Sequence, residues 1–164
     1  MNSRAADHSQ PDALAAMLAL DEPAQRLWDP AELAAILRHQ MAAPLAYDLT
    51  VAGPGPAESV ARLSASPAGE IRTFSDLLHH PSPPIELLTY VKDFARAARN
   101  DPASPLPKEI AGVLYFAAIA VARDRHGRSI TRLGEDAVRE GVEWVLAQAW
   151  VDEQTRSVLK PRAG

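Results

Sequence analysis

The hydrophobic positions of this chain repeat at helical spacing along most of its length. The longest apolar run, Ile110 to Ala122, reads IAGVLYFAAIAVA, has no charged residue among its thirteen positions and is apolar on every side. A helix without a polar face belongs inside a packed domain. The run is too short to span a bilayer, which needs about 20 apolar residues. We therefore predict one buried central helix at about residues 107–126, with the other elements packed around it.

The clearest helix start lies upstream, in the run WDPAEL at residues 28–33. Asp29 suits the N-cap, Pro30 suits the first helical turn, and Glu32 stands where a capping-box acid belongs. Trp28 and Leu33 occupy the two positions of a hydrophobic staple. The predicted helix runs to about Met41, and its expected core positions are Leu33, Ile36, Leu37 and Met41.

Four more helices are predicted from capping residues and apolar stripes. Their expected starts are Thr73 with Asp76, the run Ser82-Pro83-Pro84, Gly134 and Asp152. The helix that starts at Ser82-Pro83-Pro84 has the apolar face Leu87, Leu88, Val91, Phe94, Ala95 and Ala98. The helix that starts at Gly134 ends near Gln148 and has the apolar face Val138, Val142, Val145 and Ala149. On this helix Glu135 and Glu143 are each four residues from Arg139 and are expected to pair with it. The predicted fold class is all-α, a compact bundle of five or six short helices.

The chain divides into four predicted segments. Residues 1–27 form a polar arm with a possible short helix on the weak stripe Leu14, Met17 and Leu18, and 28–51 hold the N-terminal helix and an extended segment that alternates from Leu45 to Val51. Residues 52–72 are a Pro/Gly/Ser-rich linker, and 73–160 are the helical core domain.

Composition narrows the class of protein. Alanine and leucine dominate the apolar residues and aromatics are 5%, which favours helices. A net charge of -4 and a pI of about 5.7 provide no basic footprint, so nucleic acid is disfavoured as a partner. The absence of cysteine excludes disulfides and thiolate chemistry and suits a reducing compartment. Without a signal-peptide pattern or a membrane span, we expect a soluble cytoplasmic protein.

Asp76, His79 and His80 are the sharpest candidate constellation for chemistry. Positions three and four apart share one helix face, so these side chains could present an oxygen and an imidazole to one metal ion. The predicted helix is short and stops at Pro81, however, and histidines near a helix C-terminus also serve its terminal carbonyls. The structural role is therefore favoured, and the three residues remain weak metal candidates.

Two other polar groups are candidate sites. Arg123, Arg125, His126 and Arg128 surround Gly127 and could hold a phosphate, but they lie at a helix C-terminus, where cations are stabilised for structural reasons. Glu109 beside Lys108 is best explained as a first-turn acid. No nucleophile elbow, zinc-protease motif, P-loop or dinucleotide fingerprint is present. No catalytic residue and no cofactor are predicted.

We therefore expect a non-catalytic helical interaction protein, an adaptor or accessory subunit, that binds another protein or a second copy of itself. Trp144, Trp150 and Val151 are the predicted partner contacts, on the reasoning that a wide apolar helix needs cover and that exposed tryptophans make good anchors. The alternative is a small-molecule or metal-dependent enzyme whose site gathers Asp76, His79, His80, His39 or His126 from separate helices. Convergence of three of these side chains in one pocket would favour the enzyme.

Overall fold

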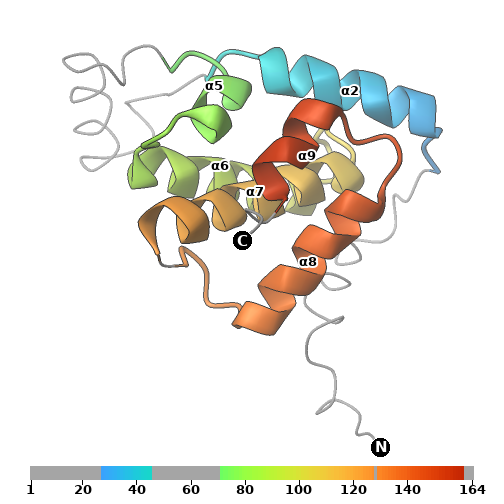
Figure 1. The fold of residues 1–164 in the computed structure, drawn as a ribbon. Coiled ribbons are helices and arrows are strands. Elements are labelled where there is room, and N and C mark those ends of the chain that lie inside the picture. Colours follow the sequence, from blue (N-terminus) through green and yellow to red (C-terminus); the bar gives the residue numbers. More distant parts are fainter. Residues whose placement is uncertain (1–26, 46–70, 128, 161–164) are drawn as a thin grey trace, which may run out of the picture.

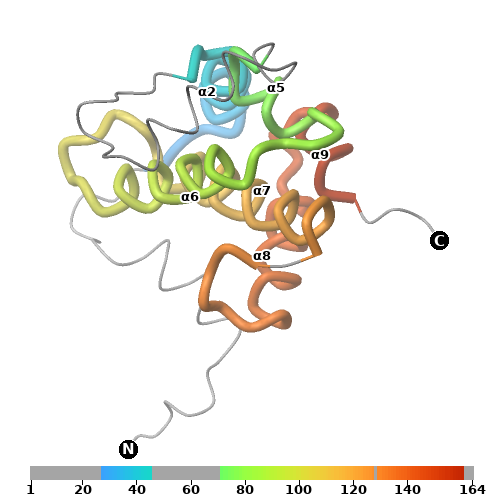
Figure 2. Tube along the Cα trace, turned by 90° about the vertical axis from the view of Figure 1, so that its left-hand side faces the viewer, coloured from blue at the N-terminus to red at the C-terminus, as the bar shows by residue number. Residues whose placement is uncertain are grey.

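Helix α7, Lys108–His126, runs through the centre of the fold and touches each of the other helices (Figures 1 and 2). The structure is a computed structural model, and it describes residues 27–45, 71–127 and 129–160. Within these ranges six helices form an all-α bundle, as the sequence predicts. All residues from Ile110 to Ala122 are buried, and Gly127 ends the helix in the left-handed conformation at φ 68°.

Reciprocal caps fix the starts of two helices that cover α7. α2, Pro30–Ala42, begins with a capping box in which the Asp29 carboxylate accepts from the Ala31 amide at 3.0 Å and Glu32 accepts from the Asp29 amide at 3.3 Å. α5, Phe74–His79, begins with the same device, built from Thr73 and Asp76. Both starts confirm the sequence prediction.

The remaining helices are α6, Ile85–Asn100, α8, Glu135–Ala147, and α9, Glu153–Leu159. Asp152 caps α9 by accepting from the Thr155 amide at 2.9 Å, as predicted. The expected cap of α6 is wrong, because its N-cap is Pro84 and no side chain bonds there. The Ser82 amide instead donates to the His80 ring at 3.0 Å, so this serine belongs to the turn before the helix.

The core differs from the predicted stripes at their edges. Leu33, Leu37 and Met41 are buried, but the other expected core residue of α2, Ile36, is half-buried. Of the expected core residues of α6, Phe94 and Ala98 are half-buried. Ala149 is exposed because α8 ends two residues before it.

Polar residues of α6 and α7 hold the α7–α8 connection, which the sequence did not reveal. Lys92 is 8% exposed, and its ammonium group donates to the Ile130 carbonyl at 3.1 Å. Tyr115 bonds Thr131 at 3.1 Å between the two hydroxyl oxygens. The ammonium group of Lys92 also lies 3.1 Å from an Asp93 carboxylate oxygen, so the apolar stem is buried while the charge is paired.

The predicted ion pairs of α8 form with other partners. Glu135 bonds Arg123 of α7 at 3.0 Å. Arg139 bonds Asp136 at 2.8 Å, three residues earlier on the same helix. The predicted pairing of Arg139 with Glu135 and Glu143 is therefore wrong. Glu135 pairs with Arg123 of α7, and Arg139 pairs with Asp136.

An antiparallel bridge joins Pro44 and Thr73, and the Leu45 amide donates to the Arg72 carbonyl at 2.9 Å. The chain therefore leaves the described structure at Leu45 and returns to it at a neighbouring point. The predicted arm, most of the extended segment and most of the linker lie outside the described residues. Among the helices that are described, none is long and apolar enough to cross a membrane.

Candidate functional site

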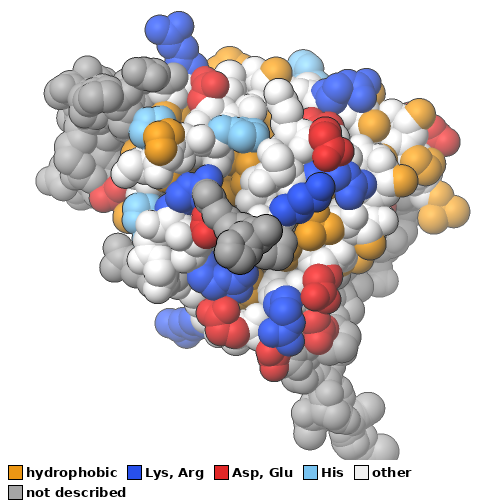
Figure 3. Space-filling view, viewed as in Figure 1, with side chains coloured by type: hydrophobic (Ala, Val, Ile, Leu, Met, Phe, Trp, Pro, Cys, Tyr) orange, Lys and Arg blue, Asp and Glu red, His pale blue; other side chains and the backbone are white. Residues whose placement is uncertain are grey.

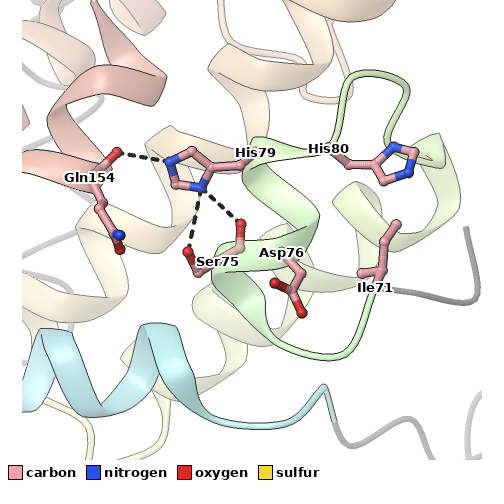
Figure 4. Close-up of a pocket in the computed structure, with 6 residues that line it drawn as sticks. All are labelled: Ile71, Ser75, Asp76, His79, His80 and Gln154. Carbon is pink, nitrogen blue, oxygen red and sulfur yellow. Dashed lines mark hydrogen bonds between the residues drawn. The ribbon is translucent and has the colours of Figure 1, made fainter.

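Asp76, His79 and His80 line one polar pocket of about 240 Å³, together with Ile71, Ser75 and Gln154 (Figure 4). The first five residues belong to α5 and its flanks, and Gln154 comes from α9. Three of the predicted side chains therefore do share a pocket, which is the condition that the enzyme alternative sets. Whether they can do chemistry depends on which of their polar atoms are available.

His79 uses both ring nitrogens to join two helices. Its Nδ1 atom lies 2.9 Å from the Ser75 carbonyl oxygen, and its Nε2 atom lies 3.1 Å from the Gln154 carbonyl oxygen. A carbonyl oxygen only accepts, so each of these bonds needs a proton on its ring nitrogen, and the tautomer decides which bond a neutral ring forms. With the proton on Nε2, Nδ1 can accept from the Ser75 hydroxyl at 3.4 Å. Both nitrogens of His79 therefore face groups of the protein itself.

His80 and Asp76 are also engaged locally. His80 Nδ1 accepts from the Ser82 amide, so a neutral ring carries its proton on Nε2 and has no second lone pair. One Asp76 carboxylate oxygen accepts from the Arg72 and Thr73 amides at 3.1 and 3.2 Å. Figure 4 shows the two imidazoles pointing in opposite directions. Among the described residues, no group of three potential ligands could hold a metal ion.

The basic turn after α7 is built from intramolecular pairs. Arg123 bonds Glu135, and Arg125 bonds its neighbour Asp124. His126 Nε2 donates to the Pro83 carbonyl at 2.7 Å, which fastens the end of α7 to the turn before α6. The side chain of Arg128 lies outside the described residues. In the view of Figure 3, positive and negative side chains of the described residues are interspersed.

The other residues of the enzyme alternative lie apart from this pocket. His39 is on the exposed face of α2, and His126 is at the end of α7. Glu109, which is not part of that alternative, is half-buried in the first turn of α7. None of them lines the polar pocket. The polar pocket therefore gathers three of the five residues of the enzyme alternative, and the other two lie elsewhere.

Of the predicted partner residues, Trp144 lies in the last turn of α8, and Trp150 and Val151 lie in the α8–α9 connection. Trp144 and Trp150 are half-buried against the core, while Val151 is 3% exposed and belongs to the core. Arg156 holds the connection by donating to the carbonyls of Leu146 at 2.6 Å, Val151 at 3.1 Å and Gln148. Outside cover for α7 would be needed only if the domain left its apolar residues uncovered, and this condition is not met, because the domain itself buries every residue from Ile110 to Ala122.

A larger apolar groove lies between α2, the second half of α6 and the α6–α7 connection. Its volume is about 620 Å³, and it is lined by Ile36, His39, Gln40, Phe94, Ala97, Ala98, Asp101, Ala103, Ser104, Pro105 and Leu106. The groove exists because α2 and α6 both pack on α7 but scarcely touch each other. In Figure 2 the α6–α7 connection curves out at the left, on the side where α2 begins.

The walls of the groove are preformed. The Phe94 ring packs on the buried ring of Phe74, with 5.7 Å between the ring centroids. The polar groups of the connecting turn bond within it, because Asp101 accepts from the Ala103 amide at 2.9 Å and Ser104 accepts from the Leu106 amide at 3.2 Å. The surface left for a ligand is mainly aliphatic and aromatic.

Sequence reasoning missed this groove. Ile36, Phe94 and Ala98 were assigned to the core because they lie on the apolar stripes of their helices. A stripe shows which face of a helix is apolar but does not show how far the neighbouring helix stands from it. The signal that indicates the groove is the partial exposure of these residues, and it can be seen only in the three-dimensional structure.

No known protein family matches the chain, and the searches of curated proteins and of solved structures find no match either.

Proposed function

We propose that the protein is a non-catalytic helical interaction protein, an adaptor or accessory subunit, that binds an apolar helical segment of another protein. The observation that carries the proposal is the groove between α2 and α6, with Ile36, Phe94 and Leu106 half-buried in its walls. Two helices that diverge over a common support leave room for a third. Laying the apolar face of a helix into such a groove is a common mode of peptide recognition.

The chemistry of the walls supports a helix rather than a small polar molecule. A small-molecule site relies on a few placed polar groups that fix the orientation of its ligand. Here the Asp101 and Ser104 side chains already accept hydrogen bonds from their own turn. The other polar lining residues, His39 and Gln40, both belong to α2. Aliphatic side chains at positions i, i+3 and i+4 of a partner helix would bury the apolar walls without leaving polar groups unsatisfied.

Trp144 and Trp150 are proposed as a second contact for the partner. Both residues are half-buried and so partly accessible to solvent, Trp144 on α8 and Trp150 in the connection that Arg156 holds in place. Tryptophan is enriched among the residues that dominate binding energy. Val151 is left out of this contact because its side chain is in the core.

A position-specific photo-cross-link tests the proposal. A benzophenone side chain placed at Ala97, which is exposed in the groove, should form one predominant adduct in native extract. The matched control carries the same group at Glu143, exposed on α8. We expect the adduct from position 97 only. Free wild-type protein added as a competitor should reduce the amount of adduct, whereas free Ala97→Arg protein should not. Equal adducts from both positions, or none from position 97, would contradict the proposal.

A further inference from the structure

Asp101 is the only acidic side chain among the described residues that line the groove. It is exposed and forms the C-cap of α6, where the α6–α7 connection begins. Its carboxylate accepts one hydrogen bond, from the Ala103 amide at 2.9 Å, and no described cation lies within ion-pair distance of it. One amide leaves most lone pairs of a carboxylate available and does not cancel its charge. The groove therefore contains one uncompensated negative charge.

The fold itself has no need of this charge. The last carbonyls of a helix carry partial negative charge, so the C-terminus of α6 favours a cation and opposes an acid. The turn does not require the charge either, because the side-chain oxygen of an asparagine would accept the same bond from the Ala103 amide. Residues that oppose a local stability rule are expected at functional sites. The charge of Asp101 is therefore a candidate for a role in binding.

A helix lying in the groove excludes water from this carboxylate. Its walls are apolar at Ile36, Phe94 and Leu106, and covering a charge without a partner is costly. His39 is the only described lining residue that can carry a positive charge, and it makes no ion pair with Asp101. The compensating cation therefore has to come from the ligand. A lysine or arginine suits this place, because its apolar stem lies along the walls while its charged head reaches the carboxylate.

We propose that the groove selects helices with a lysine or arginine beside the apolar stripe, and that Asp101 is the residue that pairs with this cation. The inference rests on the proposed function, since it concerns the helix that the groove binds. Complementary charges choose among partners more than they add affinity, and a helix with an acid at the same place would be repelled. Asp101 is thus the specificity-determining residue of an otherwise apolar surface.

Three synthetic helical peptides test the pairing. They share a leucine stripe at positions i, i+3, i+4 and i+7 and differ only in the residue that flanks the stripe at both ends, which is lysine, glutamine or glutamate. Because both ends are the same, the result does not depend on the direction in which the peptide lies. Dissociation constants are measured for full-length wild type, Asp101→Asn and Asp136→Asn.

The two variants separate local pairing from overall charge. Asp101→Asn keeps an oxygen for the Ala103 amide, whereas Asp136→Asn removes the same charge from the exposed face of α8. This control is needed because the net charge of -4 attracts a lysine peptide to the whole chain. We expect wild type and Asp136→Asn to bind the lysine peptide at least about 5-fold more tightly than the glutamine peptide, and the glutamate peptide most weakly. Asp101→Asn should bind the lysine and glutamine peptides within about twofold of each other.

Equal affinities of the three peptides for wild type, or no measurable binding of any of them, would overturn the inference. A preference for lysine that persists in Asp101→Asn would overturn it as well. In these cases the proposed function still stands if the photo-cross-link at position 97 forms, and the absence of that adduct would overturn both. A dimer of the free protein that Ala97→Arg dissociates would assign the groove to a second copy and would also overturn both.

Discussion

Gly141 of α8 lies directly against the Phe116 ring at the middle of α7. A Cβ atom built on Gly141 would approach three carbons of that ring closer than 3.0 Å. Phe116 is fully buried, so the ring cannot swing into solvent to make room. The absence of a side chain at position 141 is what lets α8 pack this closely on the central helix.

Gly141→Ala is therefore expected to destabilise the protein although alanine is the better helix former. Overpacking a core typically costs about 1 to 3 kcal/mol, which exceeds the gain of about 1 kcal/mol in helix propensity at its upper end. Chemical denaturation measures the change in the free energy of unfolding. Gly134→Ala is the comparison variant, because a Cβ there meets nothing within 4 Å, and we expect only the loss of an N-cap glycine, below about 1 kcal/mol. Adding Phe116→Leu to Gly141→Ala should recover part of the loss.

Arg156→Ala is expected to loosen the α8–α9 connection. The guanidinium group donates to three carbonyls of this connection, and hydrogen bonds from a charged group are worth about 1.5 to 3 kcal/mol. Arg156→Lys should recover only part of the stability, because an ammonium group lacks the planar fork. Arg139→Ala, which removes an exposed ion pair, serves as the control. Equal unfolding free energies for Arg156→Ala and wild type would contradict this role.

The protein purified without added metal is expected to contain no stoichiometric metal, because the imidazoles of His79 and His80 are already engaged. Added zinc should not change the melting temperature of wild type or of His80→Ala, because a ligand raises the melting temperature only by binding the folded state. Elemental analysis that finds one zinc per chain, lost in His80→Ala, would show that the structural interpretation of this pocket is wrong.

The double variant Trp144→Ala, Trp150→Ala is expected to bind the partner at least about 10-fold more weakly, in line with the cost of truncating an aromatic anchor. Circular dichroism first establishes that the variant keeps its helices. The affinity of the partner identified by cross-linking is then measured by calorimetry. An unchanged dissociation constant in the folded variant would restrict the interface to the groove.

Local signals predicted most of the helix boundaries. The capping boxes at Asp29 and Thr73 and the left-handed Gly127 act within four residues, so one segment of sequence contains all the information they need. The all-round apolar pattern of 110–122 likewise predicted burial of every residue in the run. These features can be predicted because the residues that determine them are neighbours in the sequence.

The candidate site depends on distances between helices, and the sequence does not state them. Asp76, His79 and His80 were recognised, but the carbonyl of Gln154, which occupies His79, lies 75 residues away along the chain. The groove arises where α2 and α6 diverge, so Ile36 and Phe94 could be told from core residues only once both helices were placed. Lys92 was missed for the same reason, since its acceptor belongs to a distant loop.

The dissociation constant of the cross-linked partner for Ala97→Arg tests the central claim most directly. Ala97 is exposed, so arginine at this position fills the groove without disturbing the core. We expect binding at least about 10-fold weaker than wild type, a loss of about 1.4 kcal/mol. Ala35→Arg, the same substitution on the exposed face of α2 outside the groove, should leave binding within about twofold. Equal affinities for Ala97→Arg, Ala35→Arg and wild type would contradict the assignment of this groove as the binding site.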